Sequence, residues 1–86
     1  MKIEFENVTV NPAEKSVTLQ AYSNRFTLTQ VYSLKTGKCV NVEFMDYDHY
    51  TCYEEHKQEF NLLDNAIEEH YRDTLEVLYG IEIMNA

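Results

Sequence analysis

The stretch FNLLDNAIEEHYRDTLEVL, residues 60–78, decides the fold class of this chain. Its apolar residues recur at steps of three and four, so that they share one stripe of an α-helix. The stripe comprises Phe60, Leu63, Ile67, Tyr71, Thr74 and Leu78. We therefore expect one long helix over residues 52–79, with Gly80 as its left-handed C-terminal cap. Residues 81–84 could add a short final strand.

The residues before this helix alternate between apolar and polar side chains, which is typical of β-strands. Residues 16–22 alternate cleanly, whereas residues 3–10 change phase near Glu6, which indicates a bulge. Gly37 suits the tight turn of a hairpin. Four consecutive strands with short links predict an antiparallel meander over residues 2–45.

A meander and an amphipathic helix each have one apolar face to bury, so the economical fold lays the helix across one face of the sheet. The expected class is α+β, in a single small acidic domain over residues 1–86. We expect the core to include Ile3, Phe5, Val17, Leu19, Leu28, Val40, Val42, Phe44, Phe60, Leu63, Ile67 and Leu78.

Length and composition exclude several classes of protein. With 44% apolar and 26% charged residues, the chain is too apolar for intrinsic disorder. Its first residues lack the apolar run of a signal peptide, and no stretch approaches the ~20 apolar residues of a membrane span. Two cysteines are too few for a disulfide scaffold. We therefore expect a cytoplasmic protein that does not bind membranes.

The net charge of -8 is concentrated in the second half of the chain. Residues 1–42 carry five basic and three acidic side chains, whereas residues 43–86 carry two basic and twelve acidic ones, a net of -10. Direct binding of nucleic acid is disfavoured, because phosphate contacts need clustered lysine and arginine. A partner with a basic surface is favoured instead.

The stretch DYDHYTCYEEH, residues 46–56, holds the side chains that metal and catalytic sites use. It does not fit a calcium loop, because Lys57 stands where a bidentate glutamate is required. Cys39, His49, Cys52 and His56 are ligand types for zinc, but no closely spaced pair anchors them. A Cys52 nucleophile is disfavoured, because the surrounding acids repel a thiolate. We therefore expect no metal, no cofactor and no enzymatic activity.

A structural role explains part of the same stretch. Thr51 and Glu54 have the spacing of a capping box, which predicts the start of the helix. Tyr47, Tyr50 and Tyr53 are interspersed among the acids of this stretch, and tyrosine supplies rigid contact area with a polar tip. Protein interfaces are enriched in tyrosine, so Tyr47 and Tyr50 are candidate contact residues.

The helix itself carries acids in an unfavourable arrangement. Like charges stand four residues apart at Glu55–Glu59, Asp64–Glu68 and Glu69–Asp73, each of which weakens a helix by ~0.2–0.5 kcal/mol. Glu68–Arg72 is the one well-oriented opposite pair. Such a breach of the local rules often marks a functional surface, although a solvated face of an acidic protein is the alternative.

Together these features predict a non-enzymatic module that binds a basic surface of a protein partner, for which a nucleic-acid-binding groove is one candidate. In composition the chain resembles the small acidic inhibitors that bacteriophages make against restriction, CRISPR and other nucleic-acid enzymes, some of which mimic DNA. The expected partner-binding residues are Asp46, Tyr47, Asp48, Tyr50, Glu55, Glu69, Asp73 and Glu76. Two alternatives stay open: a structural subunit or homodimer assembled through a sheet edge, and a small enzyme or metal-binding domain.

Overall fold

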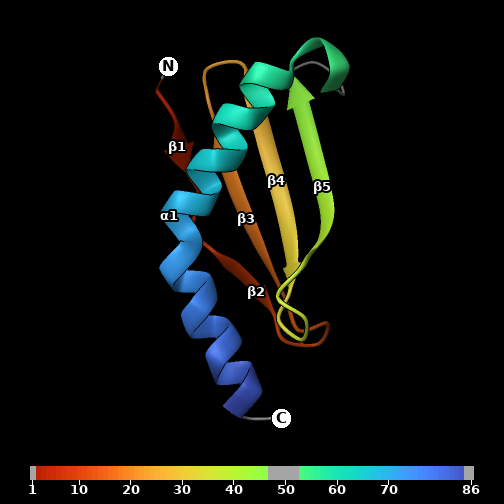
Figure 1. Ribbon diagram of the computed structural model, residues 1–86, viewed down its shortest axis with the longest axis vertical. Coiled ribbons are helices and arrows are strands. Elements are labelled where there is room, and N and C mark those ends of the chain that lie inside the picture. The colour runs from red at the N-terminus through yellow and green to blue at the C-terminus, as the bar shows by residue number, and fades with distance from the viewer. Residues whose placement is uncertain (1, 47–52, 85–86) are drawn as a thin grey trace.

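A computed structural model of the chain describes residues 2–46 and 53–84 and shows an antiparallel sheet packed against one long helix (Figure 1). The fold is α+β, as the sequence predicts. The strands are β1 (Glu4–Phe5), β2 (Thr9–Asn11), β3 (Ser16–Tyr22), β4 (Phe26–Ser33) and β5 (Cys39–Asp46). They are followed by the short 3-10 helix η1 (Tyr53–Glu55) and the α-helix α1 (Lys57–Met84).

The sheet has the order β1-β3-β4-β5, and β2 also pairs with β3. The first predicted strand is therefore divided into β1 and β2, which lie along the same neighbour. Phe5 pairs with Ala21, but Thr9 pairs with Thr18, where an unbroken register would bring it opposite Val17. This shift of one residue is the irregularity that the change of phase predicts.

Two turns form by the local chemistry expected of them. After β2, the Asn11 side chain accepts hydrogen bonds from the backbone N–H groups of Ala13 and Glu14, at 3.1 and 3.2 Å. Between β4 and β5, Gly37 has a φ of 73°, a left-handed conformation that glycine adopts without strain. The first turn brings β3 antiparallel to β2, and the second brings β5 antiparallel to β4.

The helix differs from the predicted one at both ends. It begins at Lys57 rather than at residue 52, and its first i→i+4 hydrogen bond runs from the Phe60 N–H to the His56 carbonyl at 3.0 Å. It then continues through Gly80 to Met84, so the predicted cap and the predicted strand over 81–84 are wrong. The reason is that one internal glycine costs a helix only ~1 kcal/mol, which a cooperative helix tolerates.

This difference gives the first prediction. A methyl group at Gly80 would meet no atom within 4 Å, so Gly80→Ala should raise the free energy of unfolding by about 0.5–1 kcal/mol. Gly37→Ala is the matched control and should destabilise the protein, because alanine is strained at a φ of +73°. Urea denaturation of both variants measures the two effects. A loss of stability in Gly80→Ala would mean that the helix ends before residue 80.

The core lies between α1 and the face of the sheet that α1 covers. Six of the predicted core residues are buried there: Val17, Leu19, Leu28, Phe44, Leu63 and Ile67. Four others, Ile3, Phe5, Phe60 and Leu78, are partly buried and pack against them. Ala21, Phe26, Leu34 and Tyr71 complete the buried cluster.

The prediction of Val40 and Val42 as core residues is wrong, because these side chains are 62% and 45% exposed. Val42 lies on the same face of the sheet as Phe44, whereas Val40 is the extra residue of a bulge, because Tyr32 pairs with Cys39 and Val31 with Asn41. α1 packs mainly on β3 and β4. Figure 1 shows why: α1 starts near the end of β5 and crosses the sheet away from it. The same path leaves Thr74, the one polar member of the helical stripe, exposed.

Candidate functional site

The outward side of α1 carries carboxylates that the fold does not neutralise. Glu69, Asp73 and Glu76 are exposed, and none of them forms an ion pair with any residue that the structure describes. They follow one another at steps of four and three residues, so they lie on successive turns. Arg72, their nearest basic neighbour in sequence, lies 3.7 Å from Glu68 instead.

Of the three predicted like-charge pairs, Glu69–Asp73 alone is a pair of exposed helical residues. Glu55 belongs to η1, so it is not a helical neighbour of Glu59. Asp64 turns toward the sheet, where its carboxylate accepts a hydrogen bond from Gln30.

Large apolar side chains accompany these acids, and the sequence interpretation missed them. Leu62, Val77 and Ile81 are 52%, 61% and 51% exposed on α1. Val77 stands four residues after Asp73, and Ile81 four residues after Val77, so one edge of the acidic face continues into apolar surface. A sequence signal existed for Leu62 and Val77, because both lie outside the stripe that Leu63 and Ile67 define. Ile81 follows Leu63 by five full helical turns and therefore continues that stripe instead. We call Leu62, Glu69, Asp73, Glu76 and Val77 the outer face of α1.

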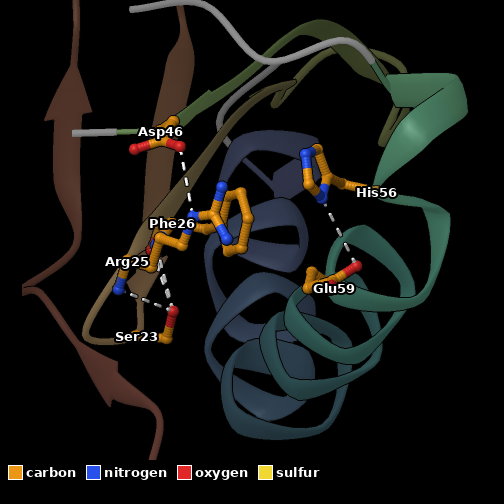
Figure 2. Close-up of polar contacts among 6 residues, drawn as sticks. All are labelled: Ser23, Arg25, Phe26, Asp46, His56 and Glu59. Carbon is orange, nitrogen blue, oxygen red and sulfur yellow. Dashed lines mark hydrogen bonds and ion pairs between the residues drawn. The ribbon is translucent and has the colours of Figure 1, made fainter. Parts of the chain in front are cut away.

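The predicted extension of this site at the end of β5 is only partly described. Tyr47, Asp48 and Tyr50 lie outside the described residues, and Glu55 is exposed on η1. The Asp46 carboxylate already has a partner within the chain, because the Arg25 Nε donates a hydrogen bond to it at 3.2 Å (Figure 2). Its side chain is only 19% exposed, so Asp46 contributes little outward charge.

The corner around Asp46 is organised by the β3–β4 turn. Figure 2 shows the Ser23 hydroxyl accepting hydrogen bonds from the backbone N–H groups of Arg25 and Phe26, at 3.3 and 3.1 Å. The Phe26 ring packs against the His56 imidazole, with ring centroids 5.0 Å apart. His56 Nδ1 lies 4.0 Å from a Glu59 carboxylate oxygen, one helical turn further on. His56 therefore packs the start of α1 onto the sheet.

The proposed set of zinc ligands does not converge. Cys39 pairs with Tyr32 at one end of β4, whereas His56 packs on Phe26 at the other end. Six residues of strand separate these positions by ~20 Å, while zinc needs its ligands at about 2 Å. His49 and Cys52 lie outside the described residues. Within residues 2–46 and 53–84, no group of three or more His, Cys, Asp or Glu side chains could hold a metal ion.

A buried polar chain links the sheet to α1. Gln30 is 3% exposed on the covered face of β4, and its amide donates to the Asp64 carboxylate at 2.6 Å. Its carbonyl oxygen accepts a hydrogen bond from the Tyr32 hydroxyl at 2.9 Å. Burial raises the pKa of Tyr32, and Cys39, Asp64 and Glu68 raise it further. The Tyr32 hydroxyl is therefore close to both the start of β5 and the flank of α1.

Two adjoining hollows lie along this flank of α1, beside β4. One has a volume of about 160 Å³ and the other about 420 Å³. Both are lined by Tyr32, Leu75 and Glu76. The smaller is also lined by Leu34, Gly37 and Tyr79, and the larger by Asp64, Ile67, Glu68 and Arg72. We call the two together the flank groove; its floor is apolar and its helical rim is mostly acidic.

On the opposite flank, Tyr71 ties α1 to the irregular edge of the sheet. Its hydroxyl donates to the Glu6 carbonyl and lies 3.3 Å from the Gln20 carbonyl oxygen. The Phe5 ring stacks on the His70 imidazole with centroids 3.8 Å apart and meets the Tyr71 ring edge-on. Burial raises the pKa of Tyr71 above its ordinary value of 10.0, and Glu6 adds to the effect.

The second prediction concerns stability at high pH. Because the folded pKa of Tyr71 is raised, its contribution is complete below the ordinary tyrosine pKa and is lost as pH rises through the raised value. Tyr71→Phe should cost about 1 kcal/mol at neutral pH, since the carbonyls lose a donor. It should also reduce the fall in stability at high pH. The measurement is urea denaturation of the wild type and of Tyr71→Phe at two pH values, about two pH units below and one pH unit above the ordinary tyrosine pKa of ~10. An identical fall in the free energy of unfolding for the two proteins would contradict the raised pKa of Tyr71.

Comparison of the chain with protein-family models, curated proteins and solved structures finds no match. None of the helices in the described part of the chain has the length together with the apolarity that crossing a membrane requires. Functional inference therefore depends on the surface of the molecule itself.

Proposed function

We propose that this protein is a non-enzymatic binding module that docks the outer face of α1 on a basic surface of a partner protein. One observation carries the proposal: exposed Leu62 and Val77 share the outward side of α1 with carboxylates that have no ion-pair partner among the described residues. A face that only keeps the protein soluble needs the carboxylates but not the apolar side chains. An interface needs both, because apolar side chains form its centre and charges its rim.

The charge of the helix supports a basic partner. The sequence of α1 contains seven acidic and two basic residues, and the two basic ones, Lys57 and Arg72, lie beside Glu54 and Glu68. Two like charges four residues apart, at Glu69 and Asp73, destabilise an isolated helix. A partner that supplies lysine or arginine would remove this repulsion, which is a gain that solvent alone does not provide.

A groove built for nucleic acid is the kind of basic surface that fits best. Carboxylates on successive helical turns lie ~5–6 Å apart, comparable to phosphates along a strand. In this proposal the protein acts in the cytoplasm as a small inhibitor or modulator of a nucleic-acid enzyme, in the manner of the phage inhibitors that it resembles in composition. Asp48, Tyr47 and Tyr50 would extend the surface at the start of the helix, and they stay predictions.

The experiment that tests the proposal is capture of the partner from cell extract with immobilised protein. Glu69→Lys/Asp73→Lys should lose the partner that the wild type retains, because it reverses the centre of the acidic face. The matched control is Glu4→Lys/Glu14→Lys, which changes the net charge equally but lies on strand β1 and on the turn after β2. Duplex DNA added in excess should release the partner if its basic surface is a nucleic-acid groove. Capture that is equal for all three proteins would refute the role of the outer face.

A further inference from the structure

Strand β5 forms a long, uncovered edge of the sheet. It runs for eight residues without proline and, among the described residues, pairs only with β4. The opposite edge is divided between β1 and β2, of two and three residues, with a shift of register between them. Short and irregular edge strands resist further pairing. β5 has a bulge at Val40, but residues 41–46 keep an unbroken register with β4 and present a row of unpaired N–H and C=O groups.

The side of β5 that faces α1 is apolar and open. Val42 projects there beside buried Phe44, and Val40 lies at the bulge; 45% and 62% of their surface is exposed. Because α1 crosses away from β5, no helix covers them (Figure 1). The flank groove continues this surface toward α1 through Leu34, Tyr32 and Leu75.

The charge beside the middle of this edge is mostly acidic, whereas Lys35 and Lys38 lie on the turn before β5 and Arg25 pairs with Asp46 at its other end. Asp64, Glu68 and Glu76 line the flank groove, and Glu43 is exposed on the other face of β5. The one basic residue that lines the groove, Arg72, lies 3.7 Å from Glu68. Tyr32 pairs with Cys39 at the start of β5 and lines the flank groove together with Asp64 and Glu68. An incoming strand therefore meets apolar side chains in the middle and carboxylates on both sides.

We propose that β5 receives an extended segment of the partner as an added strand, in which apolar residues alternate with lysine or arginine. This inference rests on the proposed function, because it describes how the same basic partner is held. Strand addition uses backbone hydrogen bonds for affinity and alternate side chains for specificity. The apolar residues of the segment cover Val40 and Val42, while its basic residues meet Glu43 on the open face of the sheet.

A second copy of this chain fits the same edge less well. It would bring its own Glu43 to the edge and would place another acidic flank, from Glu68 and Glu76, beside the first. Two chains of net charge -8 also repel each other at long range. The proposed segment instead brings its basic residues to Glu43 on the open face of the sheet and its apolar residues to Val42 on the other face.

The probe is a synthetic seven-residue peptide with free backbone N–H groups and alternating lysine and valine, titrated into the ¹⁵N-labelled protein by NMR. We expect saturable shifts over β5 and the groove side of α1, and slower hydrogen exchange at edge amides of β5. The same peptide with every backbone nitrogen methylated keeps its charge but should bind at least about tenfold more weakly. A glutamate–valine peptide should not bind. Equal binding of the methylated peptide, or shifts confined to the outer face of α1, would overturn strand addition.

Two further outcomes separate this inference from the proposed function. Val42→Lys should abolish peptide binding, while Glu69→Lys/Asp73→Lys should retain shifts on β5; circular dichroism verifies that both variants fold. If no peptide binds β5 but partner capture still depends on Glu69 and Asp73, strand addition is wrong and the proposed function stands. A concentration-dependent dimer in sedimentation equilibrium, lost in Val42→Lys, would instead assign the edge to a second copy and overturn the inference.

Discussion

Replacing Leu63 by alanine is expected to remove ~2–5 kcal/mol from the free energy of unfolding. Leu63 is 0% exposed, and it lies on the face of α1 that packs on β3 and β4. The loss combines the transfer of the missing methyl groups with the cavity that the rigid surroundings leave. A domain of this size has a total stability of ~5–15 kcal/mol, so the variant should lose a large part of it.

Leu62→Ala provides a control with the same chemistry one residue away. Leu62 is 52% exposed on the outer face of α1, so its truncation should change stability by no more than ~0.5 kcal/mol. Urea denaturation followed by circular dichroism measures both variants. A loss below about 0.5 kcal/mol for Leu63→Ala, or equal losses for the two, would show that the buried face of the helix has been assigned wrongly.

The sequence predicts the strands and the helix of this fold well, because apolar residues recur every two positions in a strand and every three or four in a helix. Alternation in residues 16–22 marks Val17, Leu19 and Ala21 as one face, and steps of three and four place Leu63 and Ile67 on one stripe; the structure buries all five. Local patterns report which face of an element is apolar. They do not report whether another element covers it.

Val40 and Val42 illustrate that limit. Alternation correctly puts Val42 on the same face as Phe44, but the direction in which α1 crosses the sheet decides which of the two is buried. Val40 is instead the extra residue of a bulge, which alternation does not predict. Gly80 illustrates another limit, because glycine is compatible both with a helix cap and with a helix interior.

The candidate site was predictable where it depends on the helix alone. The periodicity predicts the exposure of Glu69, Asp73 and Glu76, and the structure places all three at the surface. The pairing of Asp46 with Arg25 was not predictable, since it joins residues 21 positions apart that only the β3–β4–β5 arrangement brings together. The exposure of Leu62 and Val77 was predictable from the same projection, because both lie outside the apolar stripe. That of Ile81 was not, because Ile81 continues the stripe of Leu63.

The charge reversal Glu69→Lys/Asp73→Lys is expected to weaken binding to the partner at least ~10-fold. Each lost pair at a partly exposed interface contributes up to about 1 kcal/mol, and ~1.4 kcal/mol corresponds to a factor of ten. Most of the effect should appear in the association rate, because complementary charge steers encounter. The variant should fold at least as stably as the wild type, since the reversal leaves the buried face of α1 unchanged.

The central claim is that the acidic outer face of α1 captures a basic partner, and salt tests it most directly. Affinity for the captured partner should be measured for the wild type and for Glu69→Lys/Asp73→Lys at low and at high ionic strength. We expect tight wild-type binding at low salt, clear weakening at high salt, and weak binding of the variant in both conditions, because screening removes what the reversal removes. Equal affinity in all four measurements would contradict the claim and leave the acidic face as a solvated surface.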